Sequence, residues 1–283
     1  MPVVSTGSTA TAASTGSAPG DGGAPQARRV LSLPGTINLR DVGGYPTVHG
    51  RSLRWRTLLR SGTLRGLDGR GQAILAQIGL RTVIDLREDT EVAHDPDQLG
   101  RLAATHRRVP VYTLPVDRHQ TAGDLRSLYD HVVDHRGDRL TAAMLALATP
   151  GALPAIVHCS AGKDRTGLVI ALALDLAGVP AEVIAQDFAL TSYFLRDEAA
   201  AAVQRISALM STDGEELPAS LMASPPDLIL HALDRIHARH GDTRTYLLAH
   251  GATAHALDRL VEALLVPAEA SDAGPDCGPP TAG

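Results

Sequence analysis

The chain is poor in lysine, cysteine and aromatic side chains. Its 283 residues include 2 cysteines, 1 tryptophan and 2 phenylalanines, and Lys163 is its only lysine. Two cysteines are too few for a disulfide framework, and a reducing compartment suits a free thiol. The net charge of −5 does not indicate a general nucleic-acid surface, so we expect no nucleic-acid partner.

Long uncharged apolar runs are also missing, so we expect no integral membrane segment. Residues 1–29 are rich in Ser, Thr, Gly, Ala and Pro, and they lack the basic and apolar regions of a secretory signal peptide. We expect a disordered tail there and a second one over 267–283, which contains Cys277. The simplest expectation for the location is the cytoplasm.

One stretch combines a buried strand, a tight loop and a helix. Residues 155–168 read AIVHCSAGKDRTGL: an apolar run, a turn that contains Cys159, and a helical pattern from Thr166 onward. The helix ends before Gly178 and Pro180, in the order typical of a C-terminus. The first turn of such a helix has unpaired backbone N–H groups and the positive end of the macrodipole. The loop therefore predicts a concave site for an anion.

The residues of this loop suit phosphate chemistry. The small residues Ser160, Ala161 and Gly162 let the backbone close around an anion, and Arg165 has a planar fork that fits two phosphate oxygens. Cys159 lies at the base of this nest, where its thiolate is favoured and is placed for attack on phosphorus. Five residues separate Cys159 from Arg165, so the loop can bring both to one phosphate.

These residues resemble the protein tyrosine phosphatase superfamily, which has a His-Cys-x5-Arg-Ser/Thr loop. The full string HCSAGKDRTG over 158–167 is similar to the bacterial tyrosine phosphatase family of the triple-specificity, phosphoinositide-active type. Two upstream stretches also resemble that family: TINLRDVGGY over 36–45 and TVIDLR over 82–87, the latter followed by Glu88 and Glu91. The three matches occur in the family's order and span roughly residues 33–195.

The resemblance implies a role for each residue of the site. Cys159 is expected to be the nucleophile that forms a phosphocysteine intermediate, and Arg165 to stabilise the transition state. The residues expected to bind phosphate are Ser160, Ala161, Gly162, Lys163, Asp164 and Arg165; the expected supporting residues are His158, Thr166, Asp85, Arg40 and Asp41. We expect Thr166 to hydrogen-bond the thiolate, to cap the helix, or both. No metal and no cofactor are expected.

Lys163 adds a second cation to the loop, which we expect at its rim. Two cations suit a more anionic head group, which is the physical case for phosphoinositides beside phosphotyrosine. The competing interpretation is a solvated lysine with no role in binding.

The residue that protonates the leaving group remains open in the sequence. Many members of the superfamily use an aspartate on a separate loop, but this chain has no Trp-Pro-Asp, and Trp55 is far upstream. Asp164 lies inside the loop, and similar enzymes favour it for this role. Asp85, at a strand end, and Asp117 are the main competitors, whereas Asp41 and Arg40 are expected to brace the loop.

The hydrophobic periodicity predicts an α/β fold with a mainly parallel central sheet flanked by helices, as in the cysteine phosphatases, and a helical C-terminal elaboration. Strands are expected over 36–39, 51–59, 81–86, 106–112 and 155–157; helices over 68–78, 124–135, 139–148, 166–177, 181–194, 195–210, 227–240 and 244–265. We expect one phosphatase domain over 30–266, in which the helical part 181–266 resembles a segment that acts as a lid in similar enzymes.

The leading interpretation is a cysteine-dependent phosphomonoester hydrolase whose substrate is a phosphorylated protein or a phosphoinositide. Its targets would be phosphotyrosine, with phosphoserine, phosphothreonine and phosphoinositides as further candidates. Two alternatives remain: a catalytically silent phosphate-binding module, and a rhodanese-like sulfurtransferase, which also has a cysteine-headed anion loop. The resemblance also leaves export without a recognisable signal open, and the sequence does not indicate an oligomeric state.

Overall fold

The computed structural model describes residues 29–111, 124–196 and 223–267. The two expected tails lie outside the described residues, apart from Arg29 and Pro267. Asp117 and most of the helix expected over 195–210 also lie outside them.

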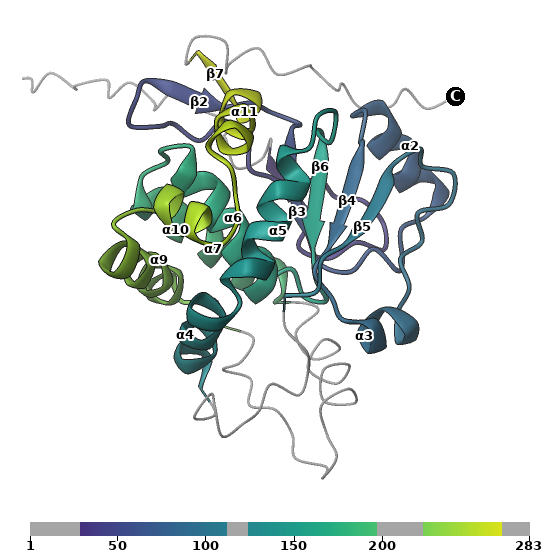
Figure 1. Cartoon of the computed structure of the whole chain (residues 1–283). Helices are drawn as coiled ribbons and strands as arrows, with labels where there is room; N and C mark the ends of the chain where they lie inside the picture. The colour runs from purple at the N-terminus through teal and green to yellow at the C-terminus, as the bar shows by residue number, and fades with distance from the viewer. Residues whose placement is uncertain (1–28, 112–123, 197–222, 268–283) are drawn as a thin grey trace, which may run out of the picture.

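A five-stranded sheet forms the centre of the molecule (Figure 1). Its order is β1 (Arg40–Asp41), β3 (Leu58–Ser61), β6 (Ala155–His158), β4 (Thr82–Asp85) and β5 (Thr105–Arg108). The strands β3, β6, β4 and β5 are parallel, whereas β1 runs antiparallel to β3. The predicted α/β class with a mainly parallel sheet is therefore confirmed.

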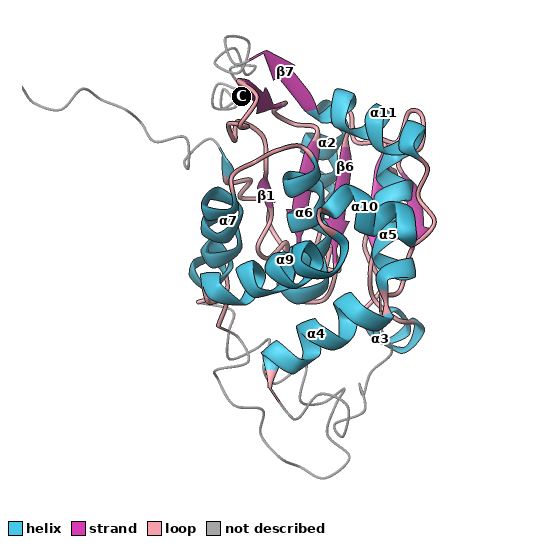
Figure 2. Cartoon of the chain, turned by 60° about the vertical axis from the view of Figure 1, so that its left-hand side comes forward, coloured by secondary structure: helices cyan, strands magenta, loops and turns pink. Residues whose placement is uncertain are grey.

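Helices cover both faces of this sheet, as Figures 1 and 2 show from two directions. Successive residues of a strand point to opposite faces. Ile84 and Val157 therefore pack in the larger core, while Val83 and Ile156 pack in the smaller one. The larger core is built with α4 (Leu125–His135), α5 (Gly137–Ala148), α6 (Asp164–Leu176), α7 (Ala181–Phe194), α9 (Pro226–His240), α10 (Thr243–Ala249) and α11 (Ala254–Leu264). The smaller core is closed by α2 (Gly69–Gln77).

Capping side chains explain why several helices begin where the sequence predicts. Asp68 accepts a hydrogen bond from the backbone N–H of Gly71 at 2.8 Å, and Asp124 accepts one from that of Ser127 at 2.8 Å. The short helix α3 (Asp89–His94) has a capping box between Glu88 and Glu91. The sequence does not predict α3, because six residues are too few to show a helical period.

The structure corrects three of the expected elements. The strand expected over 51–59 is two strands, β2 (Arg51–Leu53) and β3, because the chain turns at Arg56, which has a φ of 57°. The helix expected over 244–265 is α10, α11 and the strand β7 (Leu265–Pro267), since Gly251, with a φ of 100°, interrupts it. The strand expected over 36–39 begins only at Arg40.

The strand β7 pairs antiparallel with β2, so the last described residues lie beside an N-terminal strand. Arg51 lies opposite Pro267 and also forms an ion pair with Glu262 at 2.7 Å. None of the helices in the described parts of the chain combines the length and the apolar character that a membrane span needs.

Candidate active site

The loop that contains Cys159 lies at the carboxyl edge of the sheet, between the central strand β6 and the helix α6. Cys159 follows β6 directly and has 3% of its surface exposed. The helix α6 begins at Asp164, two residues earlier than the sequence pattern predicts. The N-terminal turn of α6 therefore starts inside the loop, and its backbone N–H groups lie close to the cysteine in sequence.

The end of β3 supports the back of this loop. The N–H of Thr63 donates to the carbonyl of Ser160 at 3.0 Å. Gly162 has a φ of 69°, and a Cβ atom at this residue would lie 2.4 Å from the carbonyl oxygen of Ser61. Glycine is thus required at 162 for both backbone conformation and space.

Arg165 is held by a carboxylate of α3. Its Nη1 and Nη2 donate to the two oxygens of Glu91 at 2.5 and 2.7 Å, and the Ser160 hydroxyl donates to the same carboxylate at 2.5 Å. Glu91 is 2% exposed. Burial opposes its ionisation, but the hydrogen bonds and the charge of Arg165 outweigh burial and hold the pKa of Glu91 below its usual value. The geometry therefore fixes the guanidinium as a planar fork beside the loop.

Lys163 was expected at the rim of the loop, but its side chain is buried in the structure. The side chain is 2% exposed, and its ammonium donates to Asp164 Oδ1 at 2.7 Å and to the carbonyl of Ala223 at 3.3 Å. Asp164 Oδ1 also accepts from the hydroxyl of Tyr129 on α4, at 3.1 Å. The lysine is therefore buried and paired, and the alternative of a solvated lysine is wrong as well.

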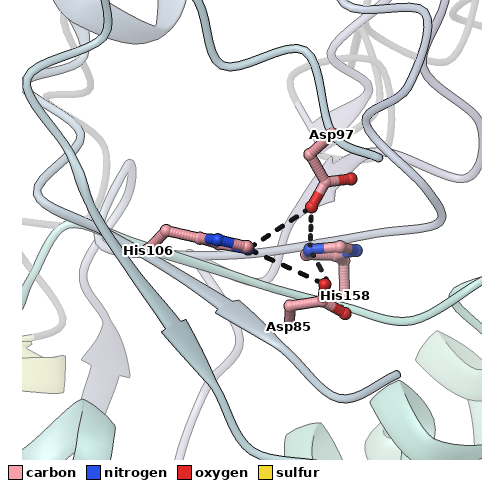
Figure 3. A group of neighbouring side chains, drawn as sticks. All are labelled: Asp85, Asp97, His106 and His158. Carbon is pink, nitrogen blue, oxygen red and sulfur yellow. Dashed lines mark ion pairs between the residues drawn. The ribbon is translucent and has the colours of Figure 1, made fainter. Parts of the chain in front are cut away.

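Behind Cys159, His158 belongs to a network of acidic and basic side chains (Figure 3). Its Nε2 lies 3.2 Å from Asp97 Oδ2 and 3.8 Å from Asp85 Oδ1. His106 of β5 approaches the same two carboxylates at 3.4 and 3.7 Å. These four side chains place their polar atoms within 4.8 Å of one another, which is close enough for metal ligands.

Arg87 pairs with both carboxylates of this cluster. Its Nε and Nη2 donate to Asp85 at 2.9 and 2.8 Å, and Nη2 lies 2.9 Å from Asp97 Oδ2. Arg87 and the protonated His106 together balance the two carboxylates, so we interpret the cluster as an ion network that orients His158. Burial opposes ionisation of Asp85, but His106 and Arg87 hold the pKa of this aspartate far below its usual value.

Asp85 is therefore an ionised, fully buried partner of Arg87, and its place suits a supporting role rather than that of the acid. The two carboxylates in turn raise the pKa of His106 to about 9.

The supporting residues of the first family match have distinct places. Arg40 is fully buried and donates to the side-chain oxygen of Asn38, whose amide donates to the carbonyls of Ala161 and Gly162 at 3.1 and 2.9 Å. Asp41 contacts the backbone N–H groups of Gly43 and Arg56 instead, at 2.8 and 2.7 Å. Arg40 thus reaches the loop through Asn38, whereas the side chain of Asp41 binds backbone N–H groups on both sides of β2.

Thr166 does not cap α6, because it is the third residue of that helix. Its hydroxyl is buried, and it has no hydrogen-bond partner within the described residues. The capping role expected from the sequence is therefore wrong. The hydroxyl does not contact the Cys159 sulfur within hydrogen-bond distance either, so the expected bond to the thiolate stays a prediction.

Several residues of the site had no role in the sequence analysis. They are Asn38, Arg60, Glu91, Tyr129 and Asp187. Asn38 and Glu91 lie within or beside the stretches that resemble the family, which is the signal that could have found them, whereas Arg60 lies on β3 between those stretches. Tyr129 and Asp187 lie on helices and have no such signal.

Comparisons with known proteins agree with this arrangement. A profile of the tyrosine phosphatase family matches residues 31–266. The chain is similar to the triple specificity protein phosphatase PtpB of Mycobacterium tuberculosis, with 31% identity over 193 residues, which covers 56% of this chain and 68% of the relative. It is also similar to a tyrosine-protein phosphatase of Nostoc commune, with 27% identity and 54% of each chain covered.

Among solved structures, the crystal structure of P. aeruginosa TpbA is similar at a TM-score of 0.33 and 18% identity, which covers 72% of this chain and 91% of that one. The matched profile spans most of the chain and contains the Cys159 loop, β4 and the Arg40 segment. The chain therefore belongs to the tyrosine phosphatase family, a family of cysteine-dependent phosphatases, as the resemblance predicted.

Proposed function

We propose that this chain hydrolyses phosphate monoesters through a phosphocysteine intermediate at Cys159. The observation that carries the proposal is the loop itself: a buried cysteine at the end of a central strand, the first turn of α6, and Arg165 fixed by Glu91. A guanidinium has five N–H donors in one plane, so the bidentate pair with Glu91 is compatible with a second pair to phosphate oxygens along another edge.

In the proposed first step, the Cys159 thiolate attacks phosphorus while the ester oxygen leaves. A sulfur–phosphorus bond forms, a phosphorus–oxygen bond breaks, and the leaving oxygen takes a proton from an acid. Arg165 and the backbone N–H groups of the loop then stabilise the charge on the equatorial oxygens. In the second step, water attacks phosphorus and frees the thiolate as inorganic phosphate is released.

We propose Asp164 as the acid that protonates the leaving group. Its side chain keeps 21% of its surface exposed, beside the loop, whereas Asp85 is fully buried and bound by Arg87. Asp164 is also oriented by Tyr129 and Lys163, at 3.1 and 2.7 Å. A positioned acid of this kind typically contributes 10²–10⁴-fold.

Phosphotyrosine is the substrate class that we propose first, with phosphoserine, phosphothreonine and phosphoinositides next. The support is the family and the triple specificity of the PtpB relative. Because Lys163 is buried against Asp164, it no longer provides an independent case for a more anionic head group.

The test is hydrolysis in EDTA of p-nitrophenyl phosphate, a phosphotyrosine peptide, a phosphothreonine peptide and a soluble phosphoinositide. We expect turnover of the first two by the wild type and none by Cys159→Ser. Phosphate binding without turnover of any substrate would instead support the silent module, and turnover of thiosulfate would support a sulfurtransferase.

We also propose that residues 30–266 form one phosphatase domain. The pairing of β2 with β7 supports this, because it ties Pro267 to Arg51. A cytoplasmic location is proposed on chemical grounds, since a reducing compartment keeps the Cys159 thiol free.

A further inference from the structure

Two buried arginines lie behind the phosphate loop. Arg40 is fully buried and Arg60 is 1% exposed. Arg60 Nη2 donates to the carbonyl of Gly162 at 2.9 Å, and Arg40 reaches the same carbonyl through the side chain of Asn38. In a trans peptide, the carbonyl and the following N–H point in opposite directions. Anchoring the carbonyls of Ala161 and Gly162 at the back therefore turns the next two N–H groups away from the arginines.

The two guanidinium groups share one acid. Asp187 of α7 accepts from Arg40 Nε at 3.2 Å and from Arg60 Nη1 at 2.5 Å, and it also accepts from the hydroxyl of Tyr45 at 3.0 Å. Within the described residues, Asp187 is the one carboxylate that forms an ion pair with either arginine. The buried group thus has two positive charges and one negative charge, which leaves an excess of one positive charge.

Arg40 and Asp187 keep their charges at neutral pH. Burial and the charge of Arg60 lower the pKa of Arg40 to about 10, against the opposing effect of Asp187. Burial opposes ionisation of Asp187, but the two arginines hold the pKa of this carboxyl far below its usual value. Burial and Asp187 raise the pKa of Tyr45, so its hydroxyl stays neutral.

The cations at the front of the loop are balanced in a different way. Arg165 is paired with Glu91, and Lys163 with Asp164, so each of these cations has a carboxyl partner of its own. The two carboxylates behind Cys159, Asp85 and Asp97, are matched by Arg87 and by the protonated His106. Arg40 and Arg60, in contrast, share a single carboxylate, so the excess positive charge near the loop comes from them. At low effective dielectric, a buried charge acts over a longer range than a solvated one.

We propose that Arg40 and Arg60 are positioning residues that hold an uncompensated positive charge behind the loop, and that this charge favours the Cys159 thiolate and bound phosphate. Asp187 sets the size of the charge and orients both arginines. The inference rests on the proposed function of the loop and assigns the source of its electrostatic field to residues outside it.

The test compares two substitutions that change the charge in opposite directions. Arg60→Gln removes a positive charge, whereas Asp187→Asn removes the negative one with little change of shape. Both are made in the full chain in a Cys277→Ser background, which leaves Cys159 as the single cysteine. The measurements are the pH midpoint for alkylation of Cys159 by iodoacetamide and the Kd for inorganic phosphate.

We expect Arg60→Gln to raise the alkylation midpoint by about one pH unit and to weaken phosphate binding about ten-fold. Asp187→Asn is expected to lower the midpoint and tighten phosphate binding. Arg235→Gln is the matched control, because Arg235 pairs with Asp134 outside this network and should leave both values unchanged.

A purely structural role would loosen the loop in both variants and move both values in the same direction, which would overturn the proposal. If Asp187→Asn does not fold, the test depends on Arg60→Gln alone. An unchanged pH midpoint for alkylation of Cys159 in folded Arg60→Gln would then overturn the proposal. Alkylation of Cys159 needs no substrate, so it can be measured even in a chain that hydrolyses nothing. In such a chain, opposite shifts of the alkylation midpoint in the two variants would refute the proposed function and support this inference. Turnover of a phosphate ester with no shift of the alkylation midpoint or of the phosphate Kd would support the proposed function and refute this inference.

Discussion

At the scale of single residues, the main feature is that Arg165 is held by Glu91, a residue outside the loop. Glu91 binds both of its terminal nitrogens, and the Ser160 hydroxyl binds the same carboxylate. A long, flexible side chain loses rotamer entropy when it is fixed, so a guanidinium that is fixed in advance loses less on binding. The position of Arg165 should therefore depend on a residue that touches no substrate.

The first prediction concerns Glu91→Gln, which keeps the shape of the side chain and removes its charge. We expect kcat/KM for a phosphotyrosine peptide to fall by about 10- to 100-fold, because small misplacements of a binding group cost rates of this order. Glu262→Gln, which removes a partner of the partly exposed Arg51, is the control and should retain full activity. Equal activity of Glu91→Gln and wild type would contradict the positioning role.

The second prediction concerns Asp164→Asn and depends on the leaving group. We expect kcat to fall about 10²-fold for a phosphotyrosine or phosphothreonine peptide, and much less for p-nitrophenyl phosphate, whose leaving group needs no proton. Tyr129→Phe removes one hydrogen bond to Asp164 and should show a weaker form of the same pattern. A uniform loss on all three substrates would exclude Asp164 as the acid.

At the scale of elements, the turn between β6 and α6 is fixed by the neighbouring strand. Gly162 lies against the end of β3, and its carbonyl accepts hydrogen bonds from Asn38 and Arg60. The chain must pass through a positive φ there to bring the first turn of α6 around the anion. The shape of the loop is thus decided by contacts from β3 and from the segment before β1, as well as by its own sequence.

The third prediction follows from that geometry. Gly162→Ala should lower kcat/KM by at least about 10²-fold and destabilise the fold by about 1–3 kcal/mol, because its Cβ meets the Ser61 carbonyl at a strained φ. Gly151→Ala is the matched control: its φ is 75°, but nothing lies within 4 Å of the added atom. If both alanine variants have the same activity, crowding at β3 does not shape the loop.

The sequence indicates elements well where the evidence is local. β4, β6, α4 and α7 appear within a few residues of their expected places, since each has a clear apolar period or an N-cap. Cys159 and Arg165 were identifiable because the loop is one continuous string. The break at Gly251 was not identified from the sequence. The pairing of β2 with β7 was not identified either, because long-range pairing leaves little trace in the sequence of either strand.

The same reason explains which site residues were missed. Asp187 is 127 residues from its partner Arg60, and Glu91 is 74 residues from Arg165. Lys163 was expected at an exposed rim, because a single lysine in a loop gives no sign of the carbonyl of Ala223 that covers it. Only the folded arrangement shows which of the many charged residues meet.

At the scale of the whole molecule, one ion network joins β4, β5 and the central strand. Asp85, His106 and His158 come from β4, β5 and β6, in which β4 pairs with both neighbours, and Asp97 comes from the loop before β5 (Figure 3). Arg87 pairs with both carboxylates. The network therefore couples the titration of His106 to the stability of the sheet.

The fourth prediction concerns stability against pH. Asp85 and Asp97 raise the pKa of His106 to about 9 from its ordinary 6.5, so this histidine binds a proton more tightly in the folded chain. Its contribution is fully present below about pH 6.5 and is lost as the pH rises through about 9. With 31% of the side chain exposed, we expect about 1 kcal/mol, or a fall in Tm of about 2–4 °C.

His106→Gln should have a lower Tm at acidic pH and should lack this part of the alkaline decline. The check is thermal unfolding of both proteins over that pH range. Parallel Tm curves for the two proteins would show that His106 does not contribute in this way.

The central claim is that Cys159 is the nucleophile, and the most direct measurement is to trap the intermediate. The wild type and Cys159→Ser are mixed with a phosphotyrosine peptide, quenched in acid and analysed by intact mass and peptide mapping. The account predicts one added phosphoryl group on the peptide that contains Cys159, in the wild type alone. Turnover of the peptide by Cys159→Ser, or a phosphoryl group on another residue, would contradict it.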